Sequence, residues 1–553
     1  MLCSLLGLLL VGCASSKKYT LGSVKTFDPD TSKIAQPVKL DQSRYWDRIN
    51  STVFQQIKKP LNLNKVGRSA GQILGVADAR EADNINVLDE PPESSWYTYR
   101  HFYDAMTLQE LARGPNSTTG PDVSGMWKIL EANLDGANSG FIIEDGKGER
   151  YRIKFDGYEY PELRTSAEVI STKFFYASGY SVPEAVITYF DPEIVVISED
   201  AKVSVPGKNR NLTMEDFRQI IENRPRNNKG EIRAIASKFT DGTPVGPWGF
   251  DGTRSDDPND RVAHEHRREL RGMRVLSSWL DDTDRSDANT MAVFTDQGYI
   301  KHYVQNFGNT LGANGYGIRS PIYGQAYLID PRYMALNAMS LGMNVNIWET
   351  IDVDPSFTSV GYFRSDFFEP GRWVPGHPLA AFENMTLRDA YWGAKLVMSF
   401  SDDDIRSIVR TGKLTNTEAE AYLSEVLIER RDKVGKYWLR RINPLDKFEA
   451  TAAKDVLQLK FKDLGIDGRL FDSDLTRYRY EVYESGKLLQ SAQNTRQPLA
   501  EFTKLSGLTS SPDNIKVLRF KIYTLRPDTD YKAVEVYVAL KQSGPGVVGI
   551  QRD

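Results

Sequence analysis

Residues 283–289 (TDRSDAN) and residues 304–312 (VQNFGNTLG) are two polar stretches that lie close together in the middle of the 553-residue chain. A helix is predicted before the first stretch, from about Glu265 to Leu280, because leucine and methionine recur there at helical spacing. After the second stretch comes an irregular region with many Gly and Pro residues, and further helices are predicted up to Asn443. The central region is therefore expected to be mainly helical around the two polar stretches.

Upstream of this region the sequence has the pattern of a β-meander. Strands are predicted at residues 127–131, 141–144 and 150–155, and an Asp-Gly pair favours a hairpin between the last two. A helix is predicted to follow, with Thr165 as its cap. One more buried strand is expected around residues 194–197. Strands followed by helices indicate an α+β fold.

This order of elements resembles the N-lobe of protein kinases, which has a glycine-containing turn, a lysine on the third strand and a glutamate on the next helix. In this sequence the turn would contribute Gly136, Asn138 and Gly140, the strand Lys154 and the helix Glu168. Backbone N–H groups of a tight loop can approach phosphates, a lysine neutralises them, and a glutamate fixes the lysine. The resemblance implies a nucleotide site, with ATP and Mg²⁺ or Mn²⁺ as its cofactors.

The two central stretches resemble two further motifs of this fold. Residues 283–289 are similar to the Asp-Arg-x-x-x-Asn catalytic loop of phosphatidylinositol kinases and HipA-type kinases. Residues 304–312 are similar to the Asp-Phe-Gly segment of the lipid kinases, including its trailing Leu-Gly. In these families the loop Asp accepts or orients the attacking hydroxyl, while the loop Asn and the Asp of Asp-Phe-Gly hold Mg²⁺. The resemblance implies that Asp284 is the catalytic base and Asn289 a metal ligand, and it places Asn306 where the principal metal-binding Asp belongs.

Two positions depart from the family pattern. The amide oxygen of Asn306 can bind Mg²⁺ but carries no charge, and Ser286 stands where these families usually have His. The acidic residues Asp281, Asp282 and Asp287 are candidates to supply the missing charge. The departure at Asn306 favours a core that has lost phosphoryl transfer.

Each candidate residue also has a purely structural explanation. Lys154 can be a solvated or ion-paired lysine at the end of a strand. Glu168 follows Thr165 by three residues and can be its partner in a capping box. The glycines can serve the turn alone, and the loop from Asp284 can cap the next element. The ordered set of motifs supports a site, whereas no single member does.

The chain begins with an apolar run that ends in Leu-Val-Gly-Cys at residues 10–13. This run is shorter than the ~20 apolar residues that span a bilayer, and its length fits a secretory signal. Its end resembles the lipobox of bacterial lipoproteins, which implies a signal peptide at residues 1–12 and lipidation of Cys13. No Asp follows the cysteine directly, and in this respect the sequence resembles lipoproteins that are sent to the outer membrane of Gram-negative bacteria. The resemblance therefore implies an outer-membrane location. Residues 13–40 are polar and predict a lipidated tether.

The C-terminal region has a different pattern. Apolar and polar residues alternate in several runs, for example at residues 534–540, which is typical of half-buried strands. Residues 446–545 are therefore predicted to form a small all-β, sandwich-like domain. Residues 41–120 are expected to be an N-terminal extension that packs on the core, with residues 121–200 as the N-lobe and 201–445 as the C-lobe. The predicted fold class is α+β, with a two-lobed protein-kinase-like core.

Composition excludes several other functions. The net charge of −4 gives no basic surface for nucleic acid. The 5 His are scattered and form no helical metal pair. The chain has 2 Cys, and maturation at Cys13 would leave no free thiol to act as a nucleophile. The kinase-like site is the main candidate that remains.

We therefore expect a lipoprotein that is tethered to the cell envelope through Cys13 and whose kinase-like body binds an envelope protein or a glycan without catalysis, as a pseudokinase. The alternative is a metal- and nucleotide-dependent phosphotransferase that acts on an envelope substrate. It would use the four residues Lys154, Glu168, Asp284 and Asn289. Free ATP is not expected outside the cytoplasm, which favours the first function, whereas the presence of these four residues favours the second.

Overall fold

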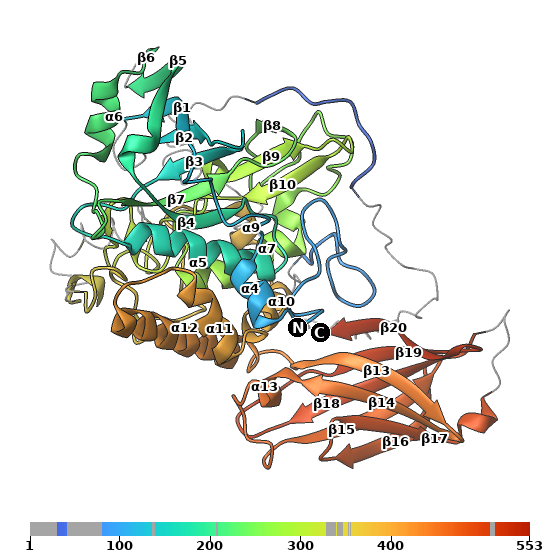
Figure 1. The fold of residues 1–553 in the computed structure, drawn as a ribbon. Coiled ribbons are helices and arrows are strands. Elements are labelled where there is room, and N and C mark those ends of the chain that lie inside the picture. Colours follow the sequence, from blue (N-terminus) through green and yellow to red (C-terminus); the bar gives the residue numbers. More distant parts are fainter. Residues whose placement is uncertain are drawn as a thin grey trace, which may run out of the picture.

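The computed structural model describes residues 30–40, 80–134, 139–205, 208–327, 339, 347–351, 353, 355–508 and 515–552. They form an α+β protein with a seven-stranded sheet at one end, a helical body in the middle and two further sheets at the other end (Figure 1). Cys13, Gly136 and Asn138 lie outside the described residues. In the described parts of the chain, no helix is long and apolar enough to cross a bilayer.

The seven-stranded sheet has the order β4-β7-β3-β2-β1-β5-β6. Its β1–β5 pair is parallel, and the other pairs are antiparallel. The strands are β1 (Trp127–Asn133), β2 (Gly140–Glu144), β3 (Arg150–Lys154), β4 (Ala185–Phe190), β5 (Val195–Val205), β6 (Lys208–Asn211) and β7 (Ile232–Lys238). The predicted three-stranded meander is present as β1 to β3. The single strand expected at residues 194–197 corresponds to the start of the longer β5, and β4, β6 and β7 were missed.

Two helices lie on opposite faces of this sheet. Alternate residues of β7 point to the two faces, so Ile235 packs with Val169 of α5 (Leu163–Ala177). Ala234 belongs to the other core, together with Phe217 of α6 (Met214–Ile221). Helix α5 is buried along almost its whole length because its other side packs on the helical body. It is therefore the element that joins the sheet to the body.

The start of α5 differs from the prediction. The helix begins at Leu163, and its N-cap is Glu162, so Thr165 is not the cap. The backbone N–H and the hydroxyl of Thr165 instead donate to the two carboxylate oxygens of Asp156, each at 2.8 Å. A carboxylate from the preceding loop thus binds the first turn, and the capping-box explanation of Glu168 is wrong.

The helical body shares one hydrophobic core with α5 and with the N-terminal extension, to which Trp96, Tyr97 and Leu111 contribute. Leu111 lies on the short helix α4 (Leu108–Arg113). The helices of the body are α7 (Arg268–Leu280), α9 (Ala380–Glu383), α10 (Leu387–Met398), α11 (Asp402–Arg410) and α12 (Thr417–Trp438). Helix α7 confirms the helix predicted before residues 283–289, although it starts three residues later.

A small sheet connects the two polar stretches of the sequence. Its order is β10-β9-β8, and its strands are β8 (Thr243–Gly246), β9 (Thr290–Phe294) and β10 (Ile300–Val304). Strands β9 and β10 pair with Thr290 opposite Val304, so the end of one stretch meets the start of the other. A second hairpin of β11 (Ala313–Asn314) and β12 (Gly317–Ile318) follows. Neither hairpin was predicted.

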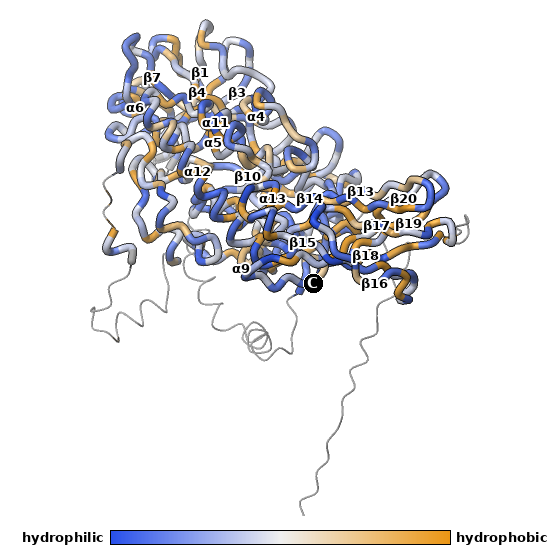
Figure 2. Tube along the Cα trace, turned by 90° about the horizontal axis from the view of Figure 1, so that it is seen from below, coloured by the Kyte–Doolittle hydropathy of each residue, from blue (hydrophilic) through white to orange (hydrophobic). Residues whose placement is uncertain are grey.

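The C-terminal region consists of two antiparallel sheets, ordered β13-β14-β17 and β16-β15-β18-β19-β20. They enclose one core to which Leu459 of the first sheet and Phe520 of the second contribute. The strands are β13 (Leu445–Ala453), β14 (Val456–Asp463), β15 (Arg477–Glu484), β16 (Lys487–Thr495), β17 (Leu499–Thr503), β18 (Val517–Leu525), β19 (Val534–Lys541) and β20 (Gly544–Arg552), with a short helix α13 (Leu464–Asp467). Hydrophobic residues are concentrated along β17 to β19 (Figure 2), as the alternation predicted.

Buried charges fix this β unit to the helical body. Arg552 at the end of β20 lies 3.3 Å from Asp89 of the N-terminal extension and 3.4 Å from Asp446 of β13. Lys395 of α10 lies 3.3 Å from the same Asp446 carboxylate. The unit is therefore held by ion pairs to two other parts of the fold.

Candidate functional site

The β9–β10 hairpin places residues 283–289 beside residues 304–312. Asn289 directly precedes β9 and Gln305 directly follows β10, and the Gln305 N–H donates to the Asn289 carbonyl at 3.0 Å. The guanidinium of Arg285 is fully buried and donates to the carbonyls of Asn289 (3.2 Å), Gln305 (2.9 Å) and Asn306 (2.9 Å). One arginine thus holds the backbone of both stretches together.

Four of the predicted site residues form a continuous chain of hydrogen bonds. The Lys154 ammonium donates to Asn306 Oδ1 at 2.7 Å, and the Asn306 amide donates to Asn289 Oδ1 at 2.9 Å. The Asn289 amide in turn donates to the Asp284 carbonyl at 2.5 Å. Lys154 also lies 3.8 Å from the Glu168 carboxylate, and both of these side chains are largely buried. The structure therefore brings Lys154, Glu168, Asp284, Asn289 and Asn306 together between the large sheet and the helical body.

The side chain of Asp284 is oriented by Asn309, a residue to which the sequence analysis gave no role. The Asn309 amide donates to Asp284 Oδ2 at 2.8 Å, and Asn309 Oδ1 accepts the N–H of Gly315 at 2.8 Å. Asn309 lies within the stretch 304–312, three residues after Asn306, so its position in the motif was the signal available. It links the candidate base to the β11–β12 hairpin.

Two glycines of the predicted motifs are required by close packing. A Cβ at Gly308 would lie 2.9 Å from the Glu168 carboxylate and 2.9 Å from the Arg164 side chain. A Cβ at Gly140 would lie 2.3 Å from the Ile153 carbonyl on the paired strand β3. The glycine at 308 therefore lets the second stretch approach Glu168, and the glycine at 140 is explained by strand pairing.

Tyr316, at the tip of the β11–β12 hairpin, ties this segment to the large sheet. Its hydroxyl lies 2.5 Å from Ser139 Oγ, just before β2, and accepts from Arg224 at 3.2 Å. Its ring lies beneath two guanidinium groups, at 4.7 Å from Arg224 and 5.6 Å from Arg164. The segment that follows Asn306 is thus attached to both the sheet and α5.

The oxygen atoms at this site are not suited to coordinate a divalent cation. Both side-chain oxygens that the resemblance assigns to the metal, on Asn306 and Asn289, already accept hydrogen bonds from protein donors. Both are uncharged amide oxygens, whereas Mg²⁺ bound by few protein groups depends on carboxylates. Across the described residues, no group of three or more His, Cys, Asp or Glu side chains is arranged to hold one metal ion.

The three acidic residues that were candidates to replace the missing charge bond other groups. Asp281 lies 2.9 Å from the Arg319 guanidinium and also accepts from Trp373 Nε1 at 3.0 Å. Asp282 lies 2.8 Å from Arg285 Nε. Asp287 accepts the backbone N–H of residue 250 at 3.3 Å. Each of these carboxylates has a structural role in the loop around the site.

The pH dependence of stability should report on Asp282. Burial raises the pKa of Asp282 from 3.8 to about 6, although the Arg285 guanidinium opposes this shift. The folded state therefore binds more protons than the unfolded state between these values, and the free energy of unfolding should fall as pH rises from about 4 to about 6. The neutral variant Asp282→Asn should lose this contribution, which is about 3 kcal/mol at 1.36 kcal/mol per pKa unit.

Urea unfolding of both proteins at several pH values between about 4 and 7 measures this difference. Asp296→Asn, an exposed residue of the same β9–β10 hairpin, is the matched control and should follow the wild type. Parallel curves for wild type and Asp282→Asn would show that Asp282 is ionised throughout this range.

Comparisons with known proteins show a similarity among solved structures. No protein-family model matches the chain, and no curated protein matches it significantly. Among solved structures, the chain is similar to the crystal structure of the golgi casein kinase, with 9% sequence identity and a TM-score of 0.27. This similarity covers 73% of this chain and 93% of that chain. At this TM-score the likeness alone identifies neither fold nor function.

Proposed function

We propose that this protein is a lipoprotein anchored to the cell envelope through Cys13, and that its body is a two-lobed, kinase-like module that binds a ligand or partner without transferring phosphoryl groups. The first lobe is the seven-stranded sheet with α5, and the second is the helical body. The pairing of Lys154 on β3 with Glu168 on α5, at 3.8 Å, supports the kinase-like arrangement. The apolar run that ends at Cys13 supports the anchor.

The observation that carries the non-catalytic function is the bond between Lys154 and Asn306. In phosphoryl transfer the lysine contacts the nucleotide phosphates and the residue at position 306 contacts the metal. Here the lysine ammonium donates to Asn306 Oδ1 at 2.7 Å and lies 3.8 Å from Glu168, so both Lys154 and Asn306 have partners within the protein. An amide at this position also brings no charge to hold the cation. The site is thus stabilised without the two components that the reaction needs.

The phosphotransferase alternative has one specific observation in its favour. The Asp284 carboxylate is held in a defined orientation by Asn309 at 2.8 Å, as a catalytic base would be. This arrangement keeps the alternative open to test.

Calorimetric titration of the full chain with ATP, with and without Mg²⁺ or Mn²⁺, distinguishes the two functions. The proposal predicts that neither metal strengthens ATP binding by as much as tenfold, which is about 1.4 kcal/mol. It also predicts that the terminal phosphate of ATP is not transferred or hydrolysed.

Metal-dependent binding that disappears in both Lys154→Ala and Asp284→Ala would contradict the proposal and support the enzyme. Lys147→Ala is the matched control, because Lys147 lies in the turn between β2 and β3 and its side chain is 72% exposed. The anchor is tested separately by incorporation of labelled palmitate, which Cys13→Ala should abolish.

A further inference from the structure

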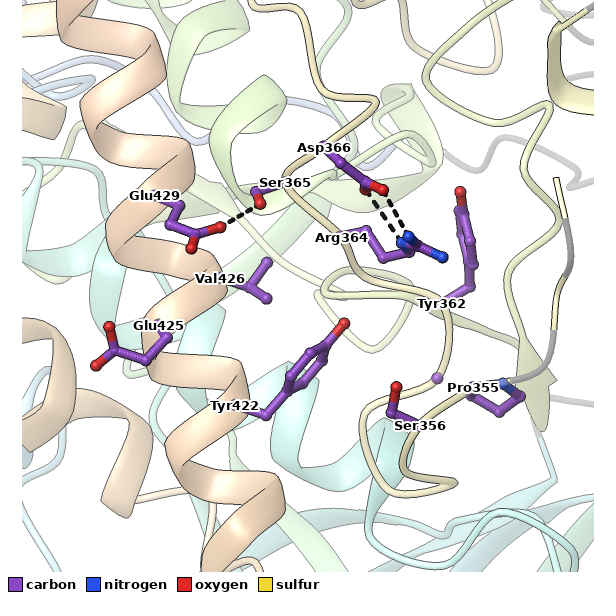
Figure 3. Close-up of a pocket in the computed structure, with 11 residues that line it drawn as sticks. Pro355, Ser356, Tyr362, Arg364, Ser365, Asp366, Tyr422, Glu425, Val426 and Glu429 are labelled. Carbon is purple, nitrogen blue, oxygen red and sulfur yellow. Dashed lines mark hydrogen bonds and ion pairs between the residues drawn. The ribbon is translucent and has the colours of Figure 1, made fainter.

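A hollow of about 360 Å³ lies between helix α12 and residues 355–366, away from the Lys154 site. Tyr422, Val426 and Glu429 line it from α12, where their spacing places them on one face of the helix (Figure 3). The facing segment contributes seven residues: Pro355, Ser356, Gly361, Tyr362, Arg364, Ser365 and Asp366. The volume is at the lower end of the range of about 300–1,000 Å³ that holds small ligands.

The walls of this hollow combine aromatic rings with polar groups. The Tyr422 hydroxyl donates to the Phe363 carbonyl at 3.1 Å, which fixes the ring at the edge of the hollow. Burial raises the pKa of Tyr362 to about 12, so its phenol remains a neutral hydrogen-bond donor at neutral pH. Val426 is buried beneath them. The hollow therefore combines two tyrosine rings with hydrogen-bond donors and acceptors.

The charges in the hollow are largely neutralised within the protein. Arg364 and Asp366 form a two-pronged ion pair with distances of 3.1 and 2.5 Å, and both side chains remain about half exposed. The Glu425 carboxylate accepts from Arg406 at 2.9 Å. Glu429 accepts from the Ser365 hydroxyl. The Arg364–Asp366 pair has no net charge, and the Glu429 carboxylate, which accepts from a neutral hydroxyl, disfavours an anionic ligand.

A purely apolar ligand fits this hollow no better than an anionic one. The polar groups of Arg364, Asp366 and Glu429 would lose water without gaining partners if a purely apolar ligand covered them. A neutral ligand with an apolar face for the tyrosine rings and with hydroxyl groups that both donate and accept suits these walls. Pyranose sugars have this combination of C–H faces and hydroxyl edges.

We propose that this hollow is a carbohydrate-binding site that takes a short segment of a neutral glycan, with Tyr422 and Tyr362 against the sugar rings and Arg364, Asp366 and Glu429 bonded to hydroxyl groups. The hollow is separate from the Lys154 site, so the result of the nucleotide titration does not affect the proposal. The segment that lines the hollow packs closely on the second polar stretch. A Cβ at Gly361 of this segment would lie 2.7 Å from the carbonyl of Gly312.

Saturation-transfer NMR and calorimetry with the full chain test this site. The probes are the tetrasaccharides of β-1,4-linked N-acetylglucosamine, β-1,4-linked glucose and α-1,4-linked glucose. At least one should bind saturably, with transfer to sugar-ring protons from tyrosine. Tyr422→Ala should weaken that binding at least tenfold, and Glu429→Gln should weaken it about threefold, while Tyr422→Phe should retain most of it.

Two matched variants control for general effects of substitution. Tyr158→Ala removes a tyrosine that is 70% exposed elsewhere on the surface, and Glu418→Gln removes a carboxylate from the first turn of the same helix α12. Both should bind the probe like the wild type. Arg364→Gln changes an exposed side chain and should also weaken binding of the sugar. It provides a second test if Tyr422→Ala does not fold.

Three results would overturn the proposal. The first is that no probe binds saturably to the folded chain. The second is that binding is unchanged in Tyr422→Ala or, if that variant is unfolded, in both Arg364→Gln and Glu429→Gln. The third is that a basic peptide such as Gly-Arg-Gly amide binds in the hollow and the sugars do not, which would assign the surface to a cationic partner.

Discussion

Replacement of Asp389 by alanine is expected to lower the free energy of unfolding by about 3–5 kcal/mol, because it leaves two buried guanidinium groups without their shared carboxylate. The Asp389 side chain is fully buried and lies 2.7 Å from Arg268 Nε and 3.2 Å from Arg271. It also accepts the backbone N–H of Thr386 at 2.9 Å and its hydroxyl at 2.8 Å, in the capping box of α10. The substitution therefore removes an ion-pair centre and the side-chain half of the capping box together, while Thr386 remains the N-cap.

Chemical denaturation followed by two probes, tryptophan fluorescence and far-ultraviolet circular dichroism, measures this loss and shows whether the transition is two-state. The matched control is Asp403→Ala, which removes an aspartate from the first turn of α11 where the side chain is 81% exposed. The free energy of unfolding of this control should stay within about 0.5 kcal/mol of the wild-type value. A loss of less than 1 kcal/mol in Asp389→Ala would show that water or another carboxylate replaces it.

The same region shows what the sequence could not predict about α7. Leucine and methionine at helical spacing predicted the helix and its apolar face correctly. The pattern predicted nothing for the opposite face, where Arg268 and Arg271 are fully buried. Their partners Asp89 and Asp389 lie more than 100 residues away in the chain. Local periodicity reports which residues are apolar, but it carries no information on which distant carboxylate will cover a charged one.

The candidate site was also predicted only in part from the sequence. The motifs predicted that Lys154, Glu168, Asp284, Asn289 and Asn306 would share one site, and the structure places them in one network of contacts. What joins them is the β9–β10 hairpin, which was missed although the sequence between its strands contains a turn with glycine. Short strands beside irregular loops give too few alternations to be recognised. The order of motifs was therefore more informative than the secondary structure predicted around them.

The sequence also could not predict which side chain donates and which accepts in each hydrogen bond of the site. The resemblance gave Asn306 and Asn289 the same role, as metal ligands. In the structure the two amides form a donor–acceptor series that starts at the Lys154 ammonium. Such a series depends on side-chain orientation, which only the packed structure determines. It also identifies the one position at which a single substitution should change the chemistry of the site.

Asn306→Asp is expected to make ATP binding dependent on Mg²⁺, with affinity at least tenfold higher in the presence of the metal than in its absence. A carboxylate at this position supplies the charge that a hard cation requires. It also cannot donate to Asn289 Oδ1, which at present accepts from Asn306 at 2.9 Å, so that oxygen is released as well. One substitution thus changes both oxygens that the resemblance assigns to the metal.

Calorimetry with the wild type, Asn306→Asp and the exposed control Asn494→Asp on β16 gives the comparison. The control adds the same charge far from the site and should leave ATP binding as in the wild type. If Asn306→Asp gains metal-dependent binding, the scaffold around Lys154 and Glu168 is competent and the amide alone explains the loss. If the variant is folded and shows no metal-dependent heat, the bonds that Asp284 and Asn289 make within the protein also prevent binding. In that case the non-catalytic state is built into the whole loop and not into one residue.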